Sequence, residues 1–260
     1  MTKVTKQVKV LIKALDILSL FYQHNELSIK EVEELTGLNR TTIFRIMLSF
    51  IDYGYIEQDA LTKRYRVSFK ILKLAGGILQ RADLIQVGKR HLIHLRELTK
   101  ESTFLAVLEE FNIIVVNWEP SYYDALINIG IGKSVPAYCT GAGKAILAHL
   151  PEQELQQLLA EHPLEQFSPN TITESAALLD ELKEAVRLGY AVSDEEFNSD
   201  IVVIGAPVFD FNGHVVAACA TSVLKSRIED EDTIAKIGEM TKKVAADISS
   251  ELGGSIILGQ

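Results

Sequence analysis

The chain has 260 residues, of which 47% are hydrophobic and 23% are charged, and its formal net charge is −9. This balance indicates a globular protein with material for one large domain or two ordinary ones. No apolar run approaches the roughly 18 residues that a membrane helix needs, and the N-terminus lacks a secretion signal. We therefore expect a cytoplasmic protein with no membrane partner. Two cysteines, Cys139 and Cys219, exclude a disulfide framework.

The charge is distributed unevenly along the chain. Residues 1–80 contain 12 Lys+Arg and 8 Asp+Glu, a net charge of +4, whereas residues 81–260 contain 14 and 27, a net charge of −13. A basic front end on an acidic body is typical of a small DNA-reading domain joined to a domain with another task.

The first 55 residues predict a helix-turn-helix. Apolar residues at three- and four-residue spacing predict a helix over 8–23. Ser28 followed three residues later by Glu31 is the capping-box pattern at the start of a second helix. Gly37 then breaks the pattern, and Asn39 can cap a third helix. Two short helices joined by a glycine-containing turn form a helix-turn-helix.

The third predicted helix carries the candidate base-reading residues at its start. Arg40, Thr41, Thr42 and Arg45 follow the capping residue Asn39, and this end of a recognition helix meets base edges in the major groove. Arginine can bind guanine with two hydrogen bonds, and threonine offers a methyl group that suits thymine. On this stretch alone, an ordinary helical hairpin with a solvated polar face remains an alternative.

A hairpin follows, in the position of the wing of a winged helix. The residues favour short strands over 55–58 and 64–67 around a polar turn. Lys63, Arg64 and Arg66 at the turn and on the returning strand could reach phosphates or the minor groove. The alternative is a solvated hairpin, but its position directly after the recognition helix favours the wing.

A longer helix is predicted over 83–100, with an apolar stripe along one side. A helix alone between two domains cannot bury such a stripe, so we expect it to pack against a second subunit, which suits a two-fold-symmetric DNA site. The same helix carries His91, His94 and Glu97 at metal-binding spacing. No further ligands cluster with them, so we interpret them as solvated or interface groups and predict no metal site.

From residue 101 onward the pattern is mixed and predicts an α+β domain with an antiparallel sheet flanked by helices. The last two strands are joined by a strong hairpin signal at 210–213. Strands are predicted over 102–108, 113–118, 125–131, 190–194, 201–209 and 215–222, and helices over 142–150, 152–160, 174–188 and after Ser226.

The glycine-rich segment 139–145 invites a phosphate-loop interpretation that fails. Tyr138 stands where a Walker A loop needs glycine, and Ala145 where it needs Ser or Thr. An anion site at a helix N-terminus and glycines for close packing both remain open. Cys139 could be a nucleophile, and the acidic run 194–196 could supply acid–base groups. A small buried residue and a solvated turn are the simpler interpretations, so we predict no catalytic residue and no cofactor.

Four segments in the same order resemble the IclR family of bacterial transcription regulators, named for the isocitrate-lyase regulon repressor. They are ALDILSLF, LTGLNRTTIFRIMLSFIDYGYIE, SVPAYCTGAGKAILAHL and GYAVSDEEFNSDIVVIGAPVFDFNGHVVAACATS. The resemblance implies a winged helix-turn-helix at 1–78, a linker and dimerisation helix at 79–100 and a GAF-like effector domain at 101–260. It also implies homodimers or homotetramers on pseudo-palindromic double-stranded DNA operators. An organic or aromatic acid would then change operator affinity or the action on RNA polymerase.

The resemblance also implies an effector pocket with backbone and side-chain contributions. The matching positions are Ile127, Val135, Gly141, Ala142, Ser193, Val203, Ala220 and Ser222. Ser193 stands where the family often has Asp, Val203 where Cys occurs and Ala220 where Ser occurs, whereas Ser222 keeps its hydroxyl. A very small polar acid would leave buried oxygens unpaired here. We therefore expect a larger or more apolar effector.

Two other classes of function compete with this regulator. A small-molecule enzyme built on the C-terminal domain would need a reactive cluster around Cys139 and Asp194, and the sequence indicates none. A protein-interaction adaptor would no longer need base-reading side chains, and the retained Arg40 and Arg45 argue against it.

Overall fold

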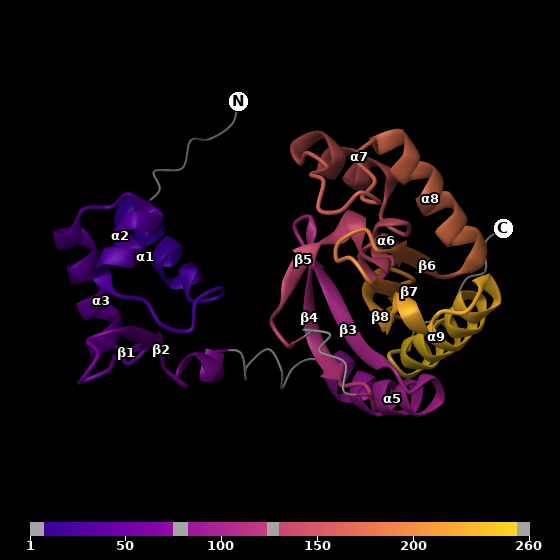
Figure 1. The fold of residues 1–260 in the computed structure, drawn as a ribbon, viewed down its shortest axis with the longest axis horizontal. Helices are drawn as coiled ribbons and strands as arrows, with labels where there is room; N and C mark the ends of the chain where they lie inside the picture. Colours follow the sequence, from indigo (N-terminus) through magenta and orange to yellow (C-terminus); the bar gives the residue numbers. More distant parts are fainter. Residues whose placement is uncertain (1–7, 75–82, 124–129, 254–260) are drawn as a thin grey trace. The chain divides into compact units, whose positions relative to one another are not determined.

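The computed structural model describes residues 8–74, 83–123 and 130–253. The chain divides between Arg81 and Ala82 into two compact units, which are described separately (Figure 1).

The first unit is a winged helix. Its helices are formed by the segments that the periodicity predicted, and its two strands form a short antiparallel hairpin in which Ile56 pairs with Val67. The elements are α1 (Lys9–Leu20), α2 (Ile29–Thr36), α3 (Arg40–Asp52), β1 (Ile56–Gln58) and β2 (Tyr65–Val67).

The start and end of α2 and the start of α3 are set by the residues that the sequence predicted. Ser28 Oγ accepts from the Glu31 N–H, while Glu31 Oε2 accepts from the Ser28 N–H at 2.7 Å. Gly37 ends α2 with φ +66, a left-handed conformation that glycine adopts without strain. Asn39 Oδ1 accepts from the Thr42 N–H at 2.9 Å and so starts α3. The turn between the helices is therefore fixed by the local sequence.

The core of the first unit joins all its elements. Leu27 and Tyr65 exchange two backbone hydrogen bonds, which attach the loop before α2 to the wing. The buried apolar side chains are Ile17, Leu27, Val32, Ile43, Ile46, Met47, Ile56 and Tyr65.

The second unit is built on an antiparallel sheet. Within the described residues the sheet has six strands in the order β5-β4-β3-β8-β7-β6. The strands are β3 (Ser102–Glu109), β4 (Asn112–Glu119), β5 (Ser134–Pro136), β6 (Ala191–Asp194), β7 (Ile201–Phe209) and β8 (Val215–Leu224). The helices are α5 (Asp83–Thr99), α6 (Gly141–Leu147), α7 (Glu152–Glu161), α8 (Ser175–Leu188) and α9 (Glu231–Glu251), with 3₁₀ turns at Ala137–Cys139 and Lys225–Arg227.

Each face of this sheet has its own apolar core. Side chains alternate along a strand, so Phe104 belongs to the cluster that includes α6 and α8, whereas Leu105 belongs to the cluster that includes α5 and α9. Figure 1 shows α5 and α9 along one side of the sheet and α6 and α8 on the other. The prediction of an α+β domain with an antiparallel sheet flanked by helices is confirmed.

Helix α5 was predicted to pack its apolar stripe against a second subunit, and the structure shows packing within the chain. Leu92 and Leu95 are fully buried in the core shared with α9 and the sheet of the same chain. The Thr103 hydroxyl donates to the Leu92 carbonyl at 2.9 Å, and Asn117 Nδ2 donates to the Ile85 carbonyl at 3.2 Å. Leu92 and Leu95 of the stripe are therefore covered within the chain, because the sheet that follows α5 folds back onto them. Leu98 of the same stripe is 48% exposed, and packing against a second subunit stays a prediction.

Further predictions from the sequence concern a strand, a metal site and a membrane helix, and the structure can be compared with each. The strand expected over 125–131 lies mostly outside the described residues, and β5 was not anticipated. His91 pairs with Glu251 of α9 at 2.9 Å, and no group of His, Cys, Asp or Glu among the described residues is arranged to hold a metal ion. None of the helices described here is both long and apolar enough to cross a bilayer.

Candidate functional sites

Helix α3 has one buried and one exposed face. Ile43, Ile46 and Met47 pack into the core of the first unit. The opposite face presents exposed side chains at helical spacing: Arg40, Thr41, Phe44 and Arg45. Thr42 is half-buried, and its N–H is bound by the cap. The residues predicted to read bases thus share an exposed surface at the N-terminal end of α3.

This surface borders a concavity of about 520 Å³. Three elements line it: the start of α2, the start of α3 and the wing. The lining residues are Ser28, Ile29, Lys30, Arg40, Thr41, Phe44, Gln58, Thr62, Lys63 and Tyr65. The structure therefore brings Lys63 of the wing to the same hollow as Arg40 and Thr41, although they are more than 20 positions apart in the sequence.

The three predicted wing cations are placed differently. Lys63 is exposed, and Arg66 is half-exposed beside Glu57, 3.4 Å away. Arg64 instead donates to both carboxylate oxygens of Glu31, at 2.9 and 2.8 Å, and to the Glu26 carbonyl at 3.1 Å. Because its guanidinium is held by these acceptors, Arg64 fastens the wing to the start of α2. Its expected phosphate contact stays a prediction.

Phe44 is a surface residue that the sequence analysis missed. Its side chain is 48% exposed and lines the concavity between α3 and the wing. Phe44 lies three and four positions after Thr41 and Arg40, so helical spacing could have placed it on their face. An exposed phenylalanine there can contact a thymine methyl group.

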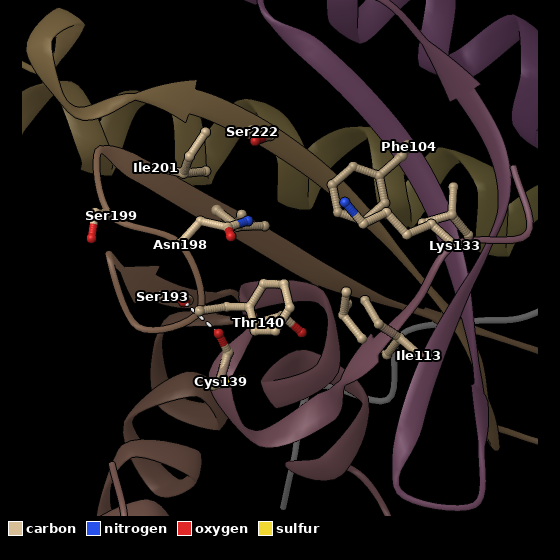
Figure 2. Close-up of a pocket in the computed structure, with 14 residues that line it drawn as sticks. Phe104, Ile113, Lys133, Cys139, Thr140, Ser193, Asn198, Ser199, Ile201 and Ser222 are labelled. Carbon is tan, nitrogen blue, oxygen red and sulfur yellow. Dashed lines mark hydrogen bonds between the residues drawn. The ribbon is translucent and has the colours of Figure 1, made fainter. Parts of the chain in front are cut away.

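The second unit contains a cavity of about 430 Å³ between the sheet and the segments that precede α6 and follow β6 (Figure 2). This volume lies within the range of small-molecule sites. Its lining residues are Phe104, Ile113, Val115, Lys133, Val135, Cys139, Thr140, Ser193, Phe197, Asn198, Ser199, Ile201, Val203 and Ser222. Figure 2 shows Lys133 and Asn198 pointing toward one another across it.

Strand register places three of these side chains in one row. Ser193 pairs with Val203, and Val203 pairs with Ser222 on the next strand. Ser193 Oγ donates to the Cys139 carbonyl at 2.8 Å, so its hydroxyl proton is already used. Ser222 is fully buried, and its hydroxyl has no partner among the described residues. A buried hydroxyl without a partner is costly, and a ligand in the cavity could satisfy it.

Some of the residues that were predicted to bind the effector line the cavity, and others do not. Val135, Ser193, Val203 and Ser222 line it. Gly141, Ala142 and Ala220 do not; they lie in the packed layer between α6 and the sheet. Ile127 lies outside the described residues. Lys133 and Asn198 are polar wall residues that the sequence analysis missed, because they lie in segments between regular elements and carry no periodic signal.

The two glycines in the first turn of α6 serve close packing. A Cβ atom on Gly141 would lie 2.2 Å from the Val203 carbonyl oxygen, and one on Gly143 would lie 2.1 Å from the Ala137 carbonyl oxygen. Real atoms do not approach so closely. Of the two interpretations left open for this segment, the packing one accounts for both glycines.

Lys144, which belongs to the glycine-rich segment, is buried. Its ammonium donates to Glu196 at 2.6 Å, to the Val192 carbonyl at 3.2 Å and to the half-exposed Glu181 at 3.3 Å. Burial raises the pKa of Glu196, and the nearby Lys144 opposes that shift. The expectation of a solvated turn is thus wrong for Glu196, which joins the turn after β6 to α6.

Cys139 lines the cavity without the properties of a nucleophile. Burial raises the pKa of its thiol to about 12, so it is protonated near neutral pH. Its Sγ lies 3.7 Å from the Pro136 carbonyl oxygen. The geometry supports the interpretation of Cys139 as a small buried residue.

A winged helix with an exposed reading face, joined to a sheet domain with a ligand-sized cavity, defines a DNA-binding regulator that responds to a small molecule. Comparison with known proteins agrees. The family model for the bacterial transcriptional regulator IclR C-terminal domain matches residues 76–250, and that for the IclR helix-turn-helix domain matches residues 10–60. The chain belongs to the IclR family of bacterial transcriptional regulators.

Individual relatives match over nearly the whole chain. The HTH-type transcriptional regulator XynR of Escherichia coli K12 is 29% identical over 242 residues, which cover 93% of this chain and 96% of XynR. The crystal structure of Thermotoga maritima IclR superposes with a TM-score of 0.74 at 28% identity, covering 95% of this chain and 100% of that one. An IclR homologue from Microbacterium hydrocarbonoxydans, complexed with 4-hydroxybenzoate, has the same fold (TM-score 0.80, 22% identity, coverage 94% and 98%).

Proposed function

We propose that this regulator binds a pseudo-palindromic operator as a homodimer or homotetramer, with α3 in the major groove and the wing beside it. The observation that carries this proposal is the single exposed surface that unites Arg40, Thr41 and Phe44 with Lys63 around one concavity. Arg40 and Arg45 read base edges, Thr41 and Thr42 contact bases or the backbone, and Asn39 fixes the start of the helix. Lys63 and Arg66 bind phosphates.

Selection of genomic DNA fragments by the purified protein tests this assignment. We expect an enriched inverted repeat, whose half-site spacing reports the symmetry of the bound oligomer. Arg45→Ala should weaken binding to that repeat by about 1–3 kcal/mol if the side chain reads a base. Lys89→Ala, which removes an exposed cation from the second unit, is the charge-matched control and should leave the affinity unchanged. Equal affinities for wild type, Arg40→Ala and Arg45→Ala would refute the placement of α3.

We infer that the cavity of the second unit binds an organic acid with an apolar or aromatic body. Its apolar wall includes Phe104, Ile113 and Phe197, which suit a ring. Lys133 on the opposite wall from Asn198 supplies positive charge for a carboxylate, and the Ser222 hydroxyl supplies a further hydrogen bond. The related fold that holds 4-hydroxybenzoate supports an acid of this size.

A thermal-stability panel tests the effector class. Each acid is added to the full-length protein at increasing concentration, because a ligand that binds only the folded state raises Tm. We expect stabilisation by aromatic acids such as 4-hydroxybenzoate and little from glyoxylate or pyruvate. Lys133→Met should abolish the stabilisation by the acid and spare that by a neutral analogue of the same ring. Strong stabilisation by glyoxylate would refute the size argument.

Effector binding is proposed to change operator affinity or the action on RNA polymerase, in the manner of a repressor. Band-shift titrations with and without the acid measure the first effect. Transcription from an operator-bearing template with purified polymerase measures the second. An acid that stabilises the protein and changes neither would remove the regulatory role from the cavity and leave DNA binding intact.

A further inference from the structure

The tip of the wing carries an apolar side chain with almost no protein contact. Leu61 lies in the turn between β1 and β2 and is 93% exposed, more than any other large apolar side chain among the described residues. Exposed leucines are common on protein surfaces, so exposure alone assigns no role. Two further features distinguish Leu61 from an ordinary exposed leucine: the hydrogen bonds that hold its turn and the position of that turn beside the concavity.

The turn is held rigidly by Asp59. Its Oδ1 accepts from the Leu61 N–H at 2.9 Å, from the Thr62 N–H at 2.7 Å and from the Thr62 hydroxyl at 3.0 Å. These hydrogen bonds lower the pKa of Asp59, so it stays ionised. The Lys63 N–H donates to the Asp59 carbonyl at 3.0 Å, and Gln58 Nε2 donates to the Lys63 carbonyl at 3.0 Å. A tip ordered in advance loses little conformational entropy when it binds a partner.

The tip also lies on the DNA-reading side of the unit. Thr62 and Lys63, the next two residues after Leu61, line the concavity that Arg40 and Thr41 of α3 share. The charges around the tip are balanced. Arg66 lies against Glu57, and the exposed Lys63 is matched by the Asp59 carboxylate, which is engaged by donors of its own turn.

We propose that Leu61 is an apolar wedge that enters the minor groove next to the major-groove site of α3 and opens a base step there. This proposal rests on the DNA-binding function proposed above. Proteins that insert an apolar side chain between base pairs unstack the step and kink the duplex. Pyrimidine–purine steps open most easily, so Leu61 adds sequence preference at positions that no polar side chain of the protein reads.

Salt dependence and DNA bending distinguish an apolar wedge from a phosphate contact. Leu61→Ala removes no charge, so it should leave the salt dependence of binding unchanged. It should reduce the bend of the bound duplex and weaken specific binding by roughly 5- to 20-fold, whereas binding to random DNA stays the same. Lys63→Ala should do the reverse, lowering the salt slope by about one phosphate and keeping the bend.

The experiment uses the full-length protein and a duplex that carries the selected inverted repeat, with donor and acceptor dyes at its ends to report bending. Leu35→Ala, which truncates a half-exposed leucine at the end of α2 away from the concavity, is the control. In a second arm, the pyrimidine–purine step under the wing is replaced by a stiff A-tract. This change should weaken wild type and leave Leu61→Ala unaffected.

An unchanged bend and an unchanged specific affinity in Leu61→Ala would overturn the proposal. So would a changed sedimentation coefficient of free Leu61→Ala, because Leu61 would then contact a second copy of the chain. Absence of specific binding by the wild-type protein would count against the DNA-binding proposal itself, and the two failures are therefore distinguishable.

Discussion

Gly205 of β7 lies directly against the backbone of Ala142 at the start of α6. A Cβ atom on Gly205 would stand 2.5 Å from the Ala142 nitrogen, and one on Gly141 would stand 2.2 Å from the Val203 oxygen. Glycine on both sides lets helix and strand approach until their backbones touch. This contact fixes α6 on the sheet, and with it the segment Cys139–Thr140 that forms one wall of the cavity.

The first prediction concerns this contact. Gly205→Ala must push α6 away from β7, because the atoms it meets are backbone and cannot swing aside. We expect a loss of about 3 kcal/mol, the upper end of overpacking costs, which lowers Tm of a unit of this size by roughly 6–12 °C. Differential scanning calorimetry of the full chain measures it.

Gly130→Ala is the matched control, because a Cβ atom on Gly130 meets nothing within 4 Å and its backbone is not left-handed. Its Tm should stay within about 2 °C of wild type. If Gly205→Ala also left Tm unchanged, the tight contact between α6 and β7 would be wrong.

The sequence predicted the positions of helices, turns and strands better than it predicted which residues pack against one another. The caps Ser28 and Asn39, the turn at Gly37 and the strand at Ile201–Phe209 could be read in advance because each depends on neighbours within a few residues. The packing of Leu92 and Leu95 could not, since the sheet that buries them comes later in the chain. Periodicity shows that a face is buried but not what buries it.

The candidate cavity shows the same limit. Of the eight positions that family resemblance placed in the pocket, four line the cavity: Val135, Ser193, Val203 and Ser222. The resemblance missed Lys133 and Asn198, which supply charge and hydrogen bonds from segments without a repeating pattern. These two residues change the chemistry expected of the pocket from mainly apolar to one with a cationic side.

The second prediction contrasts two serines of the cavity. The Ser222 hydroxyl is buried and has no partner in the described part of the chain, so Ser222→Ala should stabilise the free protein by about 1–3 kcal/mol, the cost of an unsatisfied group. Ser193 donates to the Cys139 carbonyl, so Ser193→Ala should destabilise it by about 1 kcal/mol. Urea unfolding of both variants tests the opposite signs.

The acid panel extends this test. Ser222→Ala should raise Tm of the free protein and reduce the additional rise caused by the acid. A fall in Tm of free Ser222→Ala would show that the hydroxyl already has a partner, such as a water molecule, and would remove the argument for its role with a ligand.

The third prediction concerns the buried ion pair of Lys144 and Glu196. Lys144→Met leaves the Glu196 carboxylate buried without its cation, and breaking such a pair costs about 3–5 kcal/mol. The double variant Lys144→Met/Glu196→Leu removes both charges and should recover more than half of that loss. Chemical unfolding of the single and double variants measures the recovery.

Lowering the pH should also narrow the difference in the free energy of unfolding between Lys144→Met and wild type. Without Lys144, the factor that opposes the raised pKa of Glu196 is gone, so the carboxyl takes up a proton in the folded state more readily. A folded-state pKa above the unfolded value contributes stability at low pH that is lost as pH rises. If the stability that Lys144→Met loses relative to wild type were constant from pH 5 to pH 8, this explanation would be wrong.

The final prediction uses the carboxylate that joins α2 to the wing. The Ser28 N–H, the Arg64 guanidinium and the Ser28 hydroxyl lower the pKa of Glu31 from 4.5 to about 2. A depressed folded-state pKa contributes stability that is complete above the unfolded value and is lost as pH falls toward the folded one. The stability difference between wild type and Glu31→Gln should therefore be full above pH 4.5 and shrink between pH 4.5 and pH 2.

Hydrogen exchange of the peptide that covers α3 in the full-length protein reports this difference, because comparing variants at one pH cancels the intrinsic exchange rate. Glu34→Gln is the control, since Glu34 forms an exposed pair with Lys30 at 3.6 Å, and such pairs contribute little. Arg64→Ala should reproduce part of the Glu31→Gln effect, because it removes one of the three donors that hold the carboxylate. A difference that grew in acid would reverse the sign of the linkage and refute the assignment of Glu31 as an ionised cap.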